Sequence, residues 1–83
     1  MNQPKVNDAA FYQRAKSFAN ELRHGGHPEL AEGITDAIET GCTGSEILMR
    51  LRMVLRGAHT ETELSEGERR TAHLLLAEIE RVL

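Results

Sequence analysis

The chain has 83 residues, 40% hydrophobic and 28% charged, which provides for one small core and leaves no room for a second domain. Its formal net charge of -3 argues against a general nucleic-acid binder, which usually carries a basic patch. A single cysteine, no apolar leader and no apolar run of about 18 residues favour a cytoplasmic protein without a membrane span.

The first predicted helix covers residues 8–24 and follows an N-terminal segment without helical periodicity that contains Pro4. Asn7 or Asp8 can cap it, because short polar side chains accept hydrogen bonds from the free N–H groups of a first turn. Its apolar residues recur at helical spacing and form one stripe that we expect to be buried: Phe11, Ala15, Phe18, Ala19 and Leu22.

A second helix is predicted over residues 28–40. Gly25 and Gly26 can take the positive φ that ends a helix, and Pro28 has the fixed φ that suits the first turn of the next one. Gly41 is a natural terminating residue at the other end. The predicted buried side of this helix carries Leu30, Ala31, Ile34, Ala37 and Ile38.

The third predicted helix, 44–57, begins at the sequence Thr43-Gly44-Ser45-Glu46, which fits a capping box. The segment GAHTETEL that follows is polar enough to be an exposed connection. Residues within an arc of about 120° form the predicted core face of this helix: Ile47, Leu48, Leu51, Val54, Leu55 and Ala58.

A second capping box, Ser65-Glu66-Gly67-Glu68, opens the last predicted helix, 66–83. Alternating strand patterns are absent and the links are short, so we predict an all-α fold, a compact four-helix bundle over residues 1–83. The predicted buried side of the last helix is Ala72, Leu75, Leu76, Ile79, Val82 and Leu83.

The stretch HGGH, residues 24–27, allows a metal site of His24, His27 and Glu29 to be constructed. The two intervening glycines break the helix that would fix its geometry, and a histidine at a helix C-terminus has a simpler explanation in the helix dipole. We therefore interpret HGGH as a helix junction and expect neither a metal nor a cofactor.

The loop around Cys42 invites two further hypotheses. Residues 41–45 could bind phosphate before a helix, but they lack the lysine of a P-loop and match no Gly-rich fingerprint. Cys42 could act as a nucleophile, but no histidine lies near it in the sequence. We therefore expect no catalytic residues and no enzyme activity.

The relative spacing of Ala37, Gly41 and Ile47 resembles a helix-turn-helix motif. However, the segment between His24 and Met49 contains no Lys or Arg, whereas DNA affinity depends mostly on neutralising phosphates. Nucleic-acid binding is therefore not expected, and a DNA-binding regulator remains an alternative hypothesis.

Four acidic residues fall within about 80° on the side of the second helix opposite its apolar stripe. Such a row is either a solvated face or a binding site for a basic partner. Like charges at these spacings cost a few tenths of a kcal/mol each, and the helix has no basic residue to relieve them. We call this set the acidic face: Glu29, Glu32, Asp36 and Glu39.

The third helix carries two methionines roughly opposite its core face. Methionine and arginine are common in protein interfaces, so this side predicts a docking surface or a seam for homo-oligomers. The alternative is that the helix is buried on both sides within one chain, with Leu74 covering the methionines. We call this set the methionine face: Met49, Arg52, Met53 and Arg56.

The run ELRHGGHPELAEGITDAIETGCTGSEILMRLRMVL, residues 21–55, resembles a group of small bacterial proteins of uncharacterised function. The shared features are a helix ending in Leu-Arg, a Gly-His break and a TGSEILM-type helix start. The resemblance implies a bacterial, cytoplasmic, helical protein and brings no catalytic residues.

These observations lead to one main functional hypothesis. We expect a non-catalytic protein-protein interaction module that recognises a basic partner through the acidic face or another surface through the methionine face. Its specific form is an immunity or antitoxin-like protein, and the alternatives are the DNA-binding regulator, a homo-oligomeric structural protein, and a small enzyme or metal protein.

Overall fold

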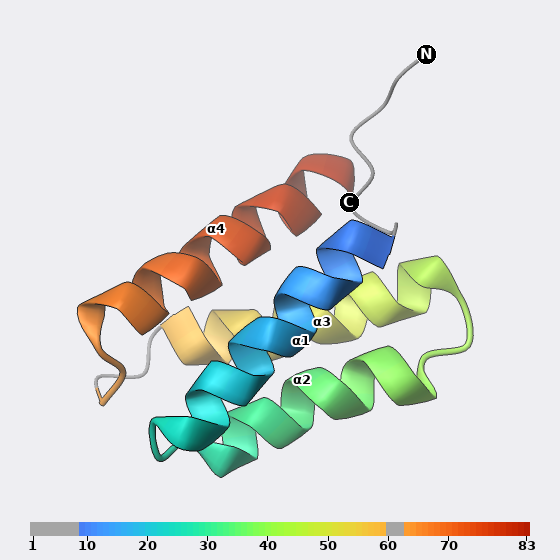
Figure 1. Ribbon diagram of the computed structural model, residues 1–83. Helices are drawn as coiled ribbons and strands as arrows, with labels where there is room; N and C mark the ends of the chain where they lie inside the picture. The colour runs from blue at the N-terminus through green and yellow to red at the C-terminus, as the bar shows by residue number, and fades with distance from the viewer. Residues whose placement is uncertain (1–8, 60–62) are drawn as a thin grey trace.

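The computed structural model describes residues 9–59 and 63–83, and within these ranges it contains four α-helices and no strand (Figure 1). The predicted all-α four-helix bundle is confirmed. The predicted caps Asn7 and Asp8 lie outside the described residues. The helices are α1 (Ala9–His24), α2 (Pro28–Thr40), α3 (Gly44–His59) and α4 (Glu66–Val82).

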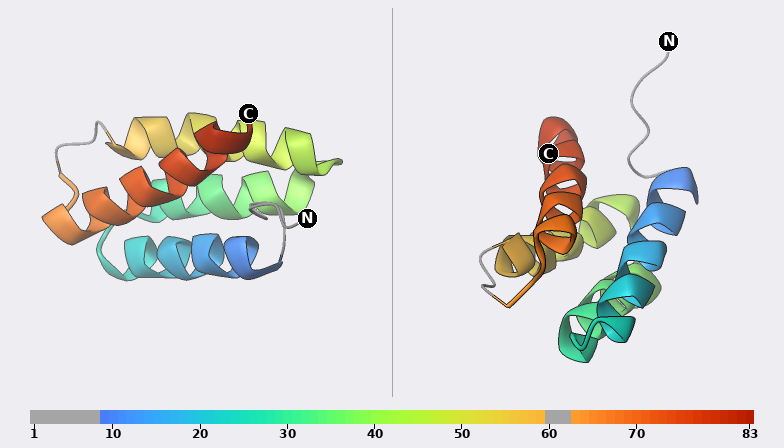
Figure 2. Two further views of the ribbon diagram at one scale, coloured as in Figure 1. Left: turned by 90° about the horizontal axis from the view of Figure 1, so that it is seen from above. Right: turned by 60° about the vertical axis from the view of Figure 1, so that its left-hand side comes forward.

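Each helix packs chiefly against its neighbours in the chain. Helices α1 and α2, α2 and α3, and α3 and α4 form extensive contacts, whereas α1 and α4 touch much less. The right-hand view of Figure 2 shows α4 standing away from α1. The bundle is therefore closed on three sides and more open on the fourth.

The core is formed by the apolar stripes that helical periodicity predicts. Every residue of the α1 stripe is at most 1% exposed, and Ile34, Leu51 and Ile79 are fully buried in the other helices. Leu30, Ile38, Ile47 and Val54 are half-buried and pack against this core.

Three positions differ from the prediction at the edges of the core: Leu64, Val82 and Leu83. Helix α3 continues to His59, two residues past its predicted end, so the predicted core residue Ala58 lies within the helix and is buried. Leu64 in the following link is also buried. A lone leucine in a polar segment has no periodicity that could reveal its burial. At the other end Val82 and Leu83 are exposed, because the apolar pattern continues past the part of α4 that other helices cover.

The HGGH stretch forms the turn between α1 and α2. The N–H of His27 donates to the carbonyl of Leu22 at 2.8 Å, and the N–H of Gly26 donates to the carbonyl of Arg23 at 3.4 Å. This is the Schellman pattern, which requires a positive φ at the residue after the cap. Gly26 has φ 91° and supplies it.

Both predicted capping sequences lie at helix starts. Ser65 and Glu68 form a complete capping box at the start of α4. At the start of α3 the Thr43 hydroxyl accepts from the Glu46 N–H at 3.1 Å, but the Glu46 carboxylate accepts from the N–H of Cys42 instead of Thr43. In α3 the hydrogen bond from the backbone to the Glu46 side chain therefore comes from the residue before Thr43, one position earlier than in a standard capping box.

Replacing Gly57 with alanine should raise the free energy of unfolding by about 0.5–1 kcal/mol, because glycine inside a helix loses more backbone entropy on folding than alanine does. Gly57 lies within α3, is exposed, and has open space where a Cβ would be added. Urea unfolding measures the gain. The control is Gly26→Ala, which should destabilise because of the positive φ; equal effects of the two changes would contradict this account.

Candidate protein-binding faces

The acidic face lies along the outer side of α2, opposite the buried residues Ala31, Ile34 and Ala37. Proline at the first turn and the steady 3.6-residue period of the helix place the four acidic residues in one row. All four side chains are exposed: Glu29, Glu32, Asp36 and Glu39.

No hydrogen bond or ion pair reaches these four carboxylates from the described residues, 9–59 and 63–83. Asp36 takes part only through its backbone carbonyl, which accepts from the Thr40 hydroxyl at 2.7 Å. The repulsion between like charges at i,i+3 and i,i+4 is therefore not offset by a cation within the described parts of the chain.

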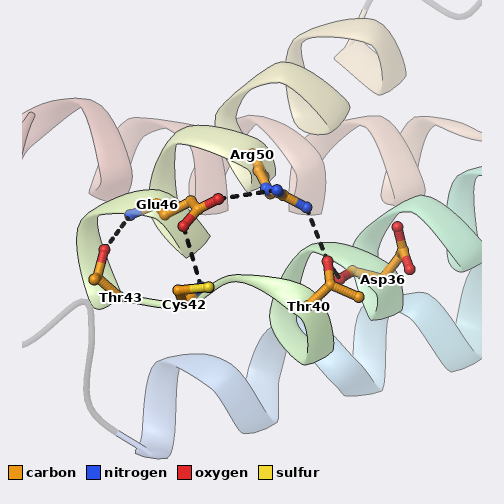
Figure 3. Close-up of polar contacts among 6 residues, drawn as sticks. All are labelled: Asp36, Thr40, Cys42, Thr43, Glu46 and Arg50. Carbon is orange, nitrogen blue, oxygen red and sulfur yellow. Dashed lines mark hydrogen bonds and ion pairs between the residues drawn. The ribbon is translucent and has the colours of Figure 1, made fainter.

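An arginine at the junction of α2 and α3 is bound to residues outside the acidic face. Arg50 donates to the Thr40 hydroxyl at 2.8 Å and to the Glu46 carboxylate at 2.9 Å. In Figure 3 these bonds join the end of α2 to the first turns of α3, and none joins Arg50 to the Asp36 carboxylate. Arg50 therefore stabilises the junction and forms no ion pair with the acidic face.

Other arginines are bound to glutamates of α4. Arg14 of α1 forms a two-pronged hydrogen bond with Glu78, at 2.6 and 2.8 Å. Arg56 of α3 donates to Glu80 at 2.8 Å. These pairs are partly exposed, so each contributes little to stability, but they direct positive charge toward α4 and away from α2.

The methionine face lies on the outer side of α3. Met49 is 51% exposed and Met53 is 75% exposed. The alternative of a helix buried on both sides is therefore wrong, and Leu74 does not cover the methionines. Arg52 is half-buried, and Arg56 lies at the edge toward α4.

Leu74 instead lines a groove between α1 and α4, the two helices that touch least. The groove has a volume of about 330 Å³ and a largely apolar lining that includes Phe18, Leu74 and Leu75. Sequence reasoning missed this groove, since the only signal was Leu74 lying off the apolar stripe of α4, and Leu74 remains 56% exposed.

The two histidines of HGGH bind different partners. His24 Nδ1 lies 2.9 Å from the backbone carbonyl of Asn20, while His27 Nε2 lies 3.6 Å from the Glu68 carboxylate on α4. They do not converge on one site, and the described residues contain no group of three or more His, Cys, Asp or Glu arranged to hold a metal ion. Cys42 is an exposed free cysteine.

The arrangement supports binding chemistry of two kinds. Exposed carboxylates that no cation of the described ranges pairs with attract lysine and arginine, whereas exposed methionines offer an adaptable apolar contact. Within residues 9–59 and 63–83 no helix has the length and apolar content needed to cross a membrane. The chain matches no protein-family model, no curated protein and no solved structure.

Proposed function

We propose that this protein is a non-catalytic interaction module whose acidic face binds a basic protein partner. The observation that carries the proposal is the row of four exposed carboxylates without a cation from the described residues to pair with them. In the isolated chain this row costs a few tenths of a kcal/mol for each like-charge pair. A basic partner would convert that cost into attraction.

Charge of this kind acts mainly on the speed and choice of association. Complementary charges steer two proteins into encounter and disfavour partners of the same sign. The same charge argues against the helix-turn-helix alternative, because α2 would then bring four carboxylates toward the phosphate backbone. The specific form of the proposal is an immunity or antitoxin-like protein that faces a basic effector.

The charge-reversed variant Glu32→Lys/Asp36→Lys tests the proposal. The partner is captured by the wild-type chain from its source cells at low salt, identified, purified, and then studied by stopped-flow association. We expect the association rate constant to fall at least about tenfold at about 50 mM salt, with the difference shrinking at about 0.5 M because salt screens exposed charges.

The matched control is Glu21→Lys/Glu66→Lys, which reverses two exposed glutamates of α1 and α4, outside the acidic face. Each reversal adds two units of charge, so both double variants move the net charge from -3 to +1. Urea unfolding should show the acidic-face variant to be no less stable than the wild type. The reason is that its two new lysines each gain an opposite charge at i,i+3 spacing, from Glu29 and from Glu39, where the wild type has like charges.

Three outcomes would overturn the proposal. The first is an equal association rate for the wild type and the acidic-face variant at low salt. The second is an equal loss of rate in the acidic-face variant and in the matched control, because net charge alone would then explain the effect. The third is a captured partner that is not basic.

A further inference from the structure

The outer side of α3 carries a stripe with an internal symmetry. Its members are Glu46, Met49, Met53 and Arg56, separated by three, four and three residues. This spacing is that of a coiled-coil seam, in which one side of a helix contacts another helix along its length. The two apolar residues lie in the middle, and the two ends carry opposite charges, so the stripe is complementary to itself when reversed.

We propose that this outer stripe pairs with the same stripe of a second copy, in antiparallel orientation, about a two-fold axis near residue 51. In that register Met49 lies opposite the partner's Met53, and Met53 opposite the partner's Met49. Glu46 lies opposite the partner's Arg56, and the reverse contact follows from the symmetry. A parallel pairing would place Glu46 against the partner's Glu46, which like-charge repulsion disfavours.

The charged ends are already part of ion pairs that leave room for this contact. Glu46 pairs with Arg50, and Arg56 pairs with Glu80; these four side chains are between 39% and 61% exposed. Across the antiparallel interface the two pairs join into a row of alternating charge, Arg50–Glu46 of one copy followed by Arg56–Glu80 of the other. Networks of this kind set orientation more than they add affinity.

Two features make the pairing weak. Arg52 borders the stripe near the axis and comes close to the partner's Arg52, which opposes association. The seam is also a single helix against a single helix, smaller than the roughly 1,200 Å² of a stable interface. We expect a dissociation constant on the order of 0.1–1 mM, the range of transient self-association.

Sedimentation equilibrium over chain concentrations from about 0.01 to about 2 mM, which bracket that dissociation constant, tests whether the stripe associates. The wild type should shift from monomer to dimer, and Met53→Lys should remain monomeric across the range. The matched control is Leu74→Lys, which places the same charge at another apolar residue that is more than half exposed, beside the α1/α4 groove, and should dimerise like the wild type. A wild type that stays monomeric, a Met53→Lys protein that still dimerises, or loss of dimer in Leu74→Lys would overturn the proposal.

Disulfide trapping tests the orientation. Cys42 is first replaced by serine, and Met49→Cys and Met53→Cys are introduced in separate chains, which are mixed with oxidised glutathione as the two-electron oxidant. An antiparallel pair gives mainly the mixed disulfide, which joins the cysteine at position 49 of one chain to the cysteine at position 53 of the other. Mainly like-with-like disulfides would overturn the antiparallel arrangement.

The inference is independent of the proposed binding of a basic partner. Glu32→Lys/Asp36→Lys should dimerise like the wild type, and Met53→Lys should bind the basic partner with an unchanged association rate. A failure of one proposal therefore leaves the other open to its own test.

Discussion

Replacing Leu51 with alanine is expected to lower the free energy of unfolding by about 2–5 kcal/mol, the range for truncating a fully buried leucine. Leu51 is 0% exposed and belongs to α3, the helix that packs against both α2 and α4. The change removes apolar contacts and leaves a cavity between helices. Urea unfolding followed by circular dichroism measures the loss.

The matched control for this variant is Leu74→Ala. The same atoms are deleted there, but the side chain is 56% exposed at the edge of the α1/α4 groove, so the loss should be well under half of that for Leu51. In a domain of this size, a loss in that range is a large part of the total free energy of unfolding. Similar losses at the two leucines would mean that α3 does not occupy the centre of the core.

Replacing Gly41 with alanine should cost about 1–3 kcal/mol through overpacking. The backbone at Gly41, with φ -69° and ψ 137°, is allowed for alanine, so the cause is steric. An added Cβ would overlap Ile47 Cγ1 and lie 3.1 Å from both the Ile47 Cα and the Ala37 carbonyl. The short junction therefore has to deform.

A double-mutant cycle with Ile47→Ala separates the two contributions to this cost. Truncating Ile47 removes the overlapping side-chain atom, so Gly41→Ala should cost less in that background, while the contacts with backbone atoms remain. Gly57→Ala is the matched control with open space around the new methyl group. Additive effects of the Gly41 and Ile47 changes would show that the side-chain overlap is not the cause.

Local patterns were sufficient to predict the helices and most of the core. Phe18 and Leu22 recur at the helical period, and Ser65 with Glu68 marks the start of α4, because these signals come from neighbours in the chain. Burial of Leu64 and exposure of Val82 depend on which distant helix lies nearby. Such contacts cannot be predicted from a short window of sequence.

The same distinction applies to the candidate binding faces. The row of Glu32 and its neighbours could be predicted from rotation about one helix axis. The lack of a cation beside this row among the described residues could not be predicted from the sequence. The partners of the arginines are distant in the chain: Arg14 reaches Glu78 across 64 positions and Arg56 reaches Glu80 across 24. The α1/α4 groove likewise results from how two distant helices are placed, which the pattern of either helix alone does not contain.

The packing of each helix against its successor also has a kinetic consequence. Most of the tertiary structure consists of helical hairpins between consecutive segments, so the chain closes only short loops to form them. Low contact order of this kind is typical of proteins that fold in microseconds to milliseconds. Because the first and last helices make so little contact with each other, α1, α2 and α3 of a nascent chain can pack together before the C-terminal helix docks onto α3.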